Sequence, residues 1–188
     1  MGLLSRTEER LVTGEELLRR PDLEPCELVE GKIVPMSPVG FLHGKIGRRI
    51  ARPLEDWSEN RPGTGEVVSG EVGIYIRRDP DTVRAADILY ISTERLAGRA
   101  PVGYLEIAPE LIVEILSPDK RRGMVEEKLK DYFAVGVDLV WVVDPEEQYV
   151  LAYRGSLFDV ERFGEGDVLM DEEILPGFSL PVANIFRE

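Results

Sequence analysis

The chain has 188 residues, of which 43% are hydrophobic and 31% are charged, and it contains 18 glycines and 13 prolines. This composition predicts one globular, turn-rich domain and excludes a disordered chain. One cysteine and one histidine cannot supply an internal disulfide or a zinc site with Cys/His spacing.

The charge balance is acidic, with 36 acidic and 23 basic residues and a net charge of −13. Such a surface opposes non-specific binding to a polyanion, yet an enzyme acting on DNA is not excluded, because local basic clusters can meet phosphates. A solvated charged face is the commoner explanation of such clusters. The two clusters are Arg48, Arg49 and Arg52, and Lys120, Arg121 and Arg122.

No apolar run reaches the roughly 20 residues needed to span a bilayer, and acidic residues interrupt the N-terminal stretch where a signal peptide requires an apolar segment. We therefore expect a cytoplasmic protein in a reducing compartment, neither exported nor membrane-spanning.

The first predicted elements are a short helix, a hairpin and a longer helix. Thr13 and Glu16 have capping-box spacing before a helix that Pro21 ends, so residues 1–25 are expected to form an N-terminal helical appendage. Over residues 26–36 apolar and polar side chains alternate on both sides of Gly31, which predicts a hairpin. Residues 41–59 carry apolar side chains at helical spacing. Pro53 lies inside that helix, and predicts either a kink or two pieces.

The middle of the chain predicts a mixed sheet. Residues 71–78 and 83–92 are two β-like runs joined by a DPDT turn, which favours an antiparallel pair. Residues 109–117 form an apolar run typical of a central strand buried on both faces. A helix over 122–135, closed by Gly136, and a buried strand from residue 139 complete a right-handed βαβ unit with parallel strands. A small β meander and an apolar segment over 174–186 follow, and that segment could pack at a dimer interface or close its own core.

Two carboxylates interrupt these aliphatic strands: Asp87 in RAADILYI and Glu114 in LIVEILS. An unpaired buried carboxylate is costly, so each must be ion-paired, protonated, or directed at a cation or an open cleft. Two acids on adjacent strands can converge on Mg²⁺ or Mn²⁺, which prefer oxygen ligands. The alternative is a buried salt bridge, with Arg84 or Lys128 as the partner.

Lys128 borders the apolar stripe of the predicted helix, whereas Lys130 falls toward its polar side. An inward ammonium could orient or help deprotonate an attacking water and stabilise charge on a phosphate. The alternative is a lysine that keeps its head at the surface beside glutamates.

Seven features follow one another along the chain: ELVEG, MSP, His43, a hairpin bearing an Asp, VEILSP, EKLKDYFAVGVDLVWVVDP and LPGFSLPVANIF. In this order they resemble the Uma-type family of bacterial restriction endonucleases. That family is similar to the PD-(D/E)XK nuclease superfamily. The resemblance covers about Cys26 to Phe186. It implies an α/β (α+β) restriction-endonuclease-like domain over residues 26–188, with an αβββαβ core, a mixed central sheet and an added C-terminal β meander.

The resemblance also implies a set of site residues. Asp87, Glu114 and Lys128 would be catalytic, and the metal would be held by Asp87, Glu114 and the backbone carbonyl of Ile115, with Glu27 as a further ligand. His43 and Ser117 would contact substrate, although a surface histidine and a turn-capping serine are ordinary alternatives. Ala86 stands where the motif has Pro. Leu116 stands where it has Lys, and Lys128 takes the position of a replacing helix lysine.

Together these features predict a Mg²⁺- or Mn²⁺-dependent DNA endonuclease of restriction or repair type that acts as a homodimer, since double-strand cleavage with one site per chain requires two copies. One alternative is a degenerate nuclease fold that serves as a binding or assembly module, favoured by Leu116 and the acidic surface. A second is a metal-free hydrolase that uses the two acids as glycosidases do, disfavoured because aromatic residues make up 7% of the chain.

Overall fold

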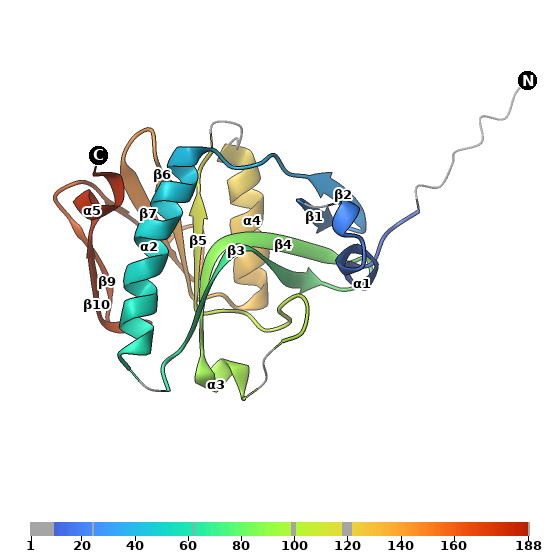
Figure 1. The fold of residues 1–188 in the computed structure, drawn as a ribbon, viewed down its shortest axis with the longest axis horizontal. Helices are drawn as coiled ribbons and strands as arrows, with labels where there is room; N and C mark the ends of the chain where they lie inside the picture. Colours follow the sequence, from blue (N-terminus) through green and yellow to red (C-terminus); the bar gives the residue numbers. More distant parts are fainter. Residues whose placement is uncertain (1–9, 24, 62, 99–100, 118–121, 188) are drawn as a thin grey trace, which may run out of the picture.

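The computed structural model describes residues 10–23, 25–61, 63–98, 101–117 and 122–187. Within these ranges the chain forms one sheet of eight strands and a second sheet of two strands. Helix α2 lies on one face of the large sheet and helix α4 on the other (Figure 1). None of the described helices is long and apolar enough to cross a membrane.

The N-terminal elements agree with their sequence signals. Helix α1 (Gly14–Leu18) begins at Thr13, whose side chain accepts from the Glu16 backbone while the Glu16 side chain accepts from the Thr13 backbone. A 3₁₀ turn, η1 (Pro21–Leu23), follows. Strands β1 (Cys26–Val29) and β2 (Lys32–Pro35) pair around Gly31, where φ is +74°. The positive φ there is a conformation that glycine adopts at little cost.

Helix α2 (Phe41–Glu59) is one continuous helix, so of the two alternatives predicted at Pro53, a kink or two pieces, the division into two pieces is wrong. Proline removes one backbone donor from the helix, and the buried side chains on both sides of it hold the remaining turns against the sheet. These buried residues are Ile46, Ile50, Ala51, Leu54, Trp57 and Ser58.

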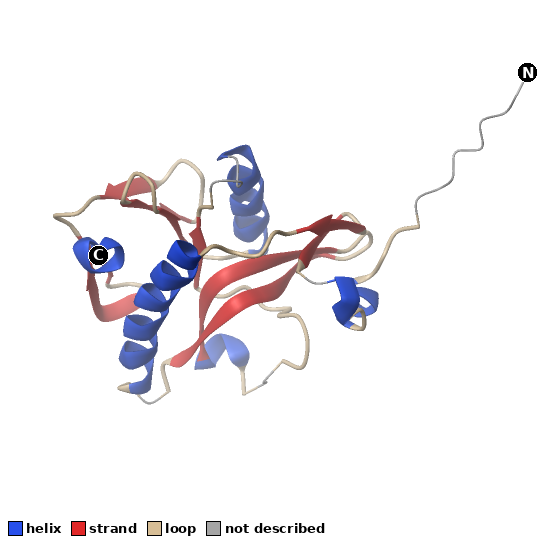
Figure 2. Cartoon of the chain, turned by 45° about the horizontal axis from the view of Figure 1, so that its top comes forward, coloured by secondary structure: helices blue, strands red, loops and turns tan. Residues whose placement is uncertain are grey.

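The core of the fold follows the predicted αβββαβ order, as α2, β3 (Gly65–Arg77), β4 (Thr82–Ser92), β5 (Leu111–Ile115), α4 (Arg122–Val135) and β6 (Leu139–Asp144). Strands β3 and β4 form a long antiparallel hairpin that extends from the body of the protein toward α1 (Figure 2). Strand β5 is buried along its whole length, is antiparallel to β4 and is parallel to β6. Short helix α3 (Thr93–Leu96) follows β4.

The C-terminal meander divides between the two sheets. Strands β7 (Tyr149–Arg154) and β8 (Val160–Phe163) extend the large sheet beyond β6, whereas β9 (Val168–Asp171) and β10 (Leu175–Pro181) form the two-stranded sheet. Helix α5 (Val182–Phe186) ends the described chain. This terminal segment closes its own core, because its apolar side chains join the cluster under α2; they are Leu175, Phe178, Leu180, Val182 and Ile185.

Candidate active site

The candidate site lies where strand β4 changes partners along one edge. On the edge away from β3, Val83 is in register with Leu28 of β1, and Ile88 is in register with Val113 of β5. No strand of the described chain pairs with residues 84–87 on that edge. The backbone groups there must find other partners, because unpaired buried N–H and C=O groups are costly.

Side chains supply those partners. The Ala85 N–H donates to Glu27 Oε1 at 3.0 Å, and the Ala85 carbonyl accepts from Lys128 Nζ at 2.8 Å. If the β4–β5 register continued, Asp87 would face Glu114 and Ala86 would face Ile115, but the Ile115 N–H donates instead to Asp87 Oδ2 at 2.6 Å. The gap between β1 and β5 is therefore filled by ionisable side chains from β1, β4 and α4.

Glu114 is the most deeply buried acid of this cluster, with 1% of its surface exposed. Its Oε1 lies 2.8 Å from Lys128 Nζ and accepts from the Tyr132 hydroxyl at 2.6 Å, and its Oε2 accepts from Lys128 at 2.9 Å. The salt bridge weighed from the sequence as an alternative for Glu114 is thus present, with Lys128 as its partner.

Asp87 has a different environment. Besides the Ile115 N–H, its Oδ2 lies 3.3 Å from Nε2 of His43, which belongs to the first turn of α2. The two side chains are 5% and 10% exposed, respectively. His43 of α2 therefore lies at the same gap as Lys128 of α4, with Asp87 as its neighbour.

Glu27 joins the cluster from β1. Its Oε1 lies 3.1 Å from Lys128 Nζ, and its Oε2 accepts from Arg84 at 3.0 Å. The Arg84 guanidinium also donates to Asp131 of α4 at 2.7 Å. Glu27 is thus a buried carboxylate in contact with two positively charged side chains, rather than an ordinary edge-strand residue.

These contacts shift the pKa values of the cluster. Burial alone would lower the pKa of Lys128, but Glu114, Glu27 and Asp87 together raise it above its usual range. Burial opposes ionisation of Glu27, yet Lys128, the Ala85 N–H and Arg84 lower its pKa. Burial, followed by the charge of Glu114, raises the pKa of Tyr132 well above its ordinary value. At neutral pH the site therefore contains a permanent ammonium, a neutral phenol and an ionised Glu27.

The other predicted residues lie outside this cluster. Lys130 is exposed, as expected, while Lys128 points inward. Ser117 is partly buried two residues beyond β5, and the Asp144 side chain accepts from the backbone of Glu146 and Glu147, as a turn cap does.

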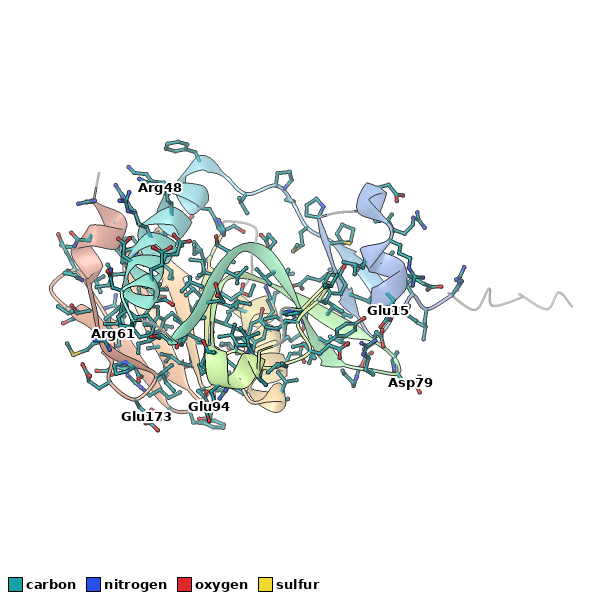
Figure 3. All side chains as sticks on the ribbon, turned by 60° about the horizontal axis from the view of Figure 1, so that its bottom comes forward. Glu15, Arg48, Arg61, Asp79, Glu94 and Glu173 are labelled. Carbon is teal, nitrogen blue, oxygen red and sulfur yellow. The ribbon has the colours of Figure 1, made fainter. Side chains whose placement is uncertain are left out.

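The two basic clusters differ in what the structure describes. Arg49 donates to backbone carbonyls of Ile185 and Arg187, and so fastens the C-terminal segment, whereas Arg48 is exposed on α2 (Figure 3). Lys120 and Arg121 lie outside the described residues, as does the side chain of Arg122.

Two members of the site were not assigned a site role from the sequence. Tyr132 was placed in the apolar stripe of its helix, but its hydroxyl holds Glu114. The signal was its position four residues after Lys128, which puts both on one helical face. Arg84 was considered only as an ion-pair partner, whereas it joins Glu27 on β1 to Asp131 on α4.

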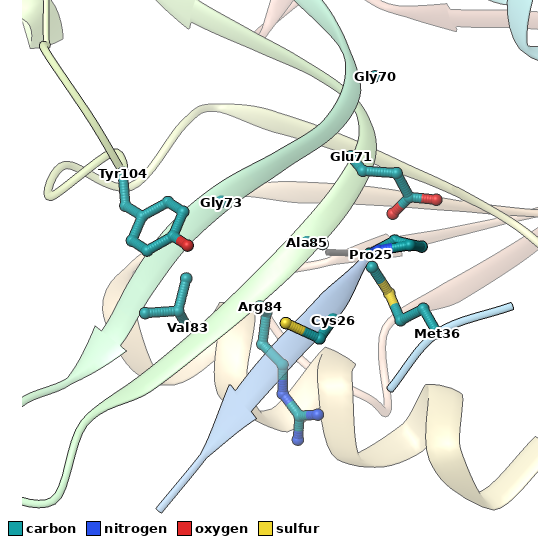
Figure 4. A pocket seen from close by; sticks show the side chains of 10 residues that line it. All are labelled: Pro25, Cys26, Met36, Gly70, Glu71, Gly73, Val83, Arg84, Ala85 and Tyr104. Atoms are coloured by element: carbon teal, nitrogen blue, oxygen red, sulfur yellow. The ribbon is translucent and has the colours of Figure 1, made fainter. Parts of the chain in front are cut away.

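A cavity of about 140 Å³ lies next to the cluster and shares Arg84 and Ala85 with it (Figure 4). Its lining does not include Glu27, Asp87, Glu114 or Lys128. Its remaining lining residues are Pro25, Cys26, Met36, Gly70, Glu71, Gly73, Val83 and Tyr104.

The residues offer oxygen and nitrogen donors for a divalent cation, although no group of three His, Cys, Asp or Glu side chains among the described residues is already arranged around one point. Asp87 Oδ2 and His43 Nε2 lie 3.3 Å apart, and His43 Nε2 is a buried atom that makes no hydrogen bond with any described residue. An unsatisfied buried nitrogen beside a carboxylate fits a cation site. Glu114 is adjacent in the next strand.

Comparison with known proteins shows which folds and families this chain is similar to. A crystal structure described as a "putative nuclease belonging to DUF820" from Anabaena variabilis is similar in fold, with a TM-score of 0.77 and 24% sequence identity; the match covers 93% of this chain and 97% of that one. A stretch of 96 residues is 30% identical to DNA replication licensing factor Mcm2 of Drosophila melanogaster, but it spans 51% of this chain and 10% of that protein. The short match to Mcm2 shows no shared family.

A family model carries the assignment further. The Uma2 family, described as "Putative restriction endonuclease", matches residues 14–183, which include α1, the whole sheet and every residue of the charged gap. The predicted resemblance and the predicted fold class are thereby confirmed, and this chain belongs to the Uma2 family.

Proposed function

We propose that the protein is an endonuclease that hydrolyses DNA phosphodiester bonds with Mg²⁺ or Mn²⁺. The family and the similar structure support a nuclease. The observation that carries the finer proposal is the gap in β4, where Asp87 and Glu114 from adjacent strands lie beside the buried ammonium of Lys128.

The metal would be held by Asp87, Glu114 and the Ile115 carbonyl, with Glu27 as a further ligand. When bound, a divalent cation polarises a phosphate oxygen and lowers the pKa of a ligated water. The Ile115 N–H orients the Asp87 carboxylate, and the Tyr132 hydroxyl orients that of Glu114. Such hydrogen bonds limit the rotation of ligand side chains.

Lys128 would act as a fixed positive charge. In the protein without metal, burial opposes the charged form of Lys128, but the neighbouring carboxylates raise its pKa, so the amine is protonated at neutral pH. A positive charge placed beforehand can stabilise the negative charge that develops on the phosphate. The raised pKa supports the electrostatic role of Lys128, and the role in deprotonation that the sequence suggested stays a prediction.

A second candidate function is a nuclease fold that binds nucleic acid or a protein without cutting. The observation in its favour is that Lys128 and Tyr132 already contact both carboxylate oxygens of Glu114. Leu116 also leaves no lysine at the usual motif position.

Cleavage assays separate the two. Supercoiled plasmid, linear duplex and single-stranded DNA are incubated with the native protein and Mg²⁺ or Mn²⁺. Asp87→Asn, Glu114→Gln and Lys128→Ala are expected to abolish cleavage, and Lys130→Ala, in an exposed position of the same helix, to retain it. Lys128→Ala should still bind Mn²⁺ by calorimetry, because oxygen ligands hold the metal.

Folding of each variant is checked by circular dichroism and thermal melting before activity is compared. Cleavage that persists in Asp87→Asn or in excess EDTA would contradict the proposal. Preferential cleavage of RNA would contradict DNA as the substrate. A native protein that binds DNA and metal but cuts no substrate would instead support the binding module.

A further inference from the structure

The contact between His43 and Asp87 lacks the geometry of an ordinary hydrogen bond. Nε2 of His43 lies 3.3 Å from Asp87 Oδ2, but it makes no hydrogen bond within the part of the chain that the structure describes. The His43 side chain is 10% exposed, so water offers little compensation. A buried polar atom without a partner requires an explanation.

The separation itself suggests one. Two ligands that each lie about 2.1 Å from one ion, at an angle between about 90° and 110°, are roughly 3.0–3.4 Å apart. The distance between Nε2 and Oδ2 falls within this range. An imidazole nitrogen that carries no proton and a carboxylate oxygen repel when they face each other, and a cation between them would turn this repulsion into attraction.

The position of His43 is determined by the fold. It lies in the first turn of α2, and the same helix is anchored to the sheet by Ile46 and Ile50, which are 1% and 0% exposed. Asp87 is held from the other side by the Ile115 N–H. Both donors are therefore placed before any cation arrives, which lowers the cost of binding.

We infer that His43 Nε2 is a nitrogen ligand of the divalent cation that Asp87 and Glu114 hold, and that it makes the site prefer Mn²⁺ over Mg²⁺. The inference rests on the proposed function. Mg²⁺ and Mn²⁺ both prefer oxygen ligands, but Mn²⁺ is a transition metal and accepts an imidazole nitrogen more readily than Mg²⁺ does. His43 then acts at the metal rather than on substrate, and it sets which metal supports cleavage.

The chain offers a direct spectroscopic test, because His43 is its single histidine. Tag-free native protein is loaded with Mn²⁺ alone and examined by pulsed electron paramagnetic resonance. A ¹⁴N coupling typical of a bound imidazole is the expected result, and it can arise from no other histidine of the chain. This measurement needs no variant and no substrate.

Calorimetry provides the matched comparison. Mn²⁺ and Mg²⁺ are titrated separately into native protein, His43→Ala, Asp87→Asn and Leu42→Ala, where Leu42 is the neighbouring residue, 51% exposed on the same helix. His43→Ala should weaken Mn²⁺ binding by about tenfold or more, as loss of a ligand-shell contact does. It should change Mg²⁺ affinity less, and Leu42→Ala should leave both unchanged.

The outcomes distinguish this inference from the function on which it rests. Mn²⁺ that binds the native protein in an Asp87-dependent way but without ¹⁴N coupling would overturn the inference and leave the proposed function intact. An unchanged ratio of Mn²⁺ to Mg²⁺ affinity in folded His43→Ala would do the same. Failure of the native protein to bind either metal would overturn both.

Discussion

Replacement of Lys128 by methionine probes the charged gap most directly. The side chain is 8% exposed, and its ammonium lies 2.8 Å from Glu114 and 3.1 Å from Glu27. Methionine retains much of the volume but leaves both carboxylates without this cation. Removal of one partner from a buried ion pair costs about 3–5 kcal/mol. For a chain of this size the melting temperature should fall by roughly 6–20 °C.

A double-mutant cycle measures how much of this loss in the free energy of unfolding comes from the interaction between Lys128 and Glu114. Urea unfolding is measured at pH 7 without metal for native protein, Lys128→Met, Glu114→Gln and the double variant. Glu114→Gln should also destabilise the protein, because Lys128 and Tyr132 both contact this carboxylate. The double variant should be more stable than the sum of the single losses indicates, by about 0.5–3 kcal/mol.

The exposed Lys130 supplies the control, since Lys130→Met should change the free energy of unfolding by no more than about 0.5 kcal/mol. Additive losses in the cycle, or a Lys128→Met variant as stable as the native protein, would refute the account of Lys128 as the cation that holds the gap together.

Three further predictions concern single contacts. Tyr132→Phe should lower the free energy of unfolding by about 1–3 kcal/mol in urea titrations, because it removes a buried hydrogen bond to a carboxylate. Glu27→Gln should be less stable than native protein at pH 7, and this difference in the free energy of unfolding should shrink below pH 4.5. The reason is that folding lowers the pKa of Glu27, so its carboxylate stabilises the fold above the pKa of the unfolded chain, and this contribution is lost as the pH falls through the pKa of the folded protein. A constant difference from pH 7 to pH 3 would contradict this. Gly65→Ala should greatly reduce the yield of folded protein, because φ is +151° and a Cβ would lie 2.2 Å from the Ile91 carbonyl oxygen; Gly63→Ala, with φ of +84° and open space around it, is the milder control.

Features encoded by nearby residues were predictable from the sequence. The capping box at Thr13, the hairpin at Gly31 and the helix end at Gly136 each depend on a few adjacent residues, and all three are present. Asp87 and Glu114 stood out because an acid inside an aliphatic strand is costly, and both lie at the gap in the sheet. The helical stripe made Lys128 a better inward candidate than Lys130, but the stripe alone favoured a surface lysine, and only the two carboxylates argued for the inward position.

Features that depend on distant segments were not predictable in this way. The sequence pattern contains no sign that β1 and β5 occupy the same edge of β4 and leave residues 84–87 between them. Tyr132 has the pattern of a core residue, and only the fold brings its hydroxyl to Glu114. The continuity of α2 through Pro53 likewise depends on tertiary packing, which overrides local preference.

The side-chain partners of Ala85 also affect local opening of the sheet and amide hydrogen exchange. In most strands an amide proton is protected from solvent exchange by a neighbouring strand, but here Glu27 protects it, and Lys128 binds the carbonyl of the same residue. Exchange at this amide therefore requires only that the Glu27 carboxylate move away, without separation of β4 from β3 or β5. The Ala85 amide is thus a native probe inside the gap: its exchange rate reports whether β1, β4 and α4 are held together, and whether an incoming ligand tightens or loosens them.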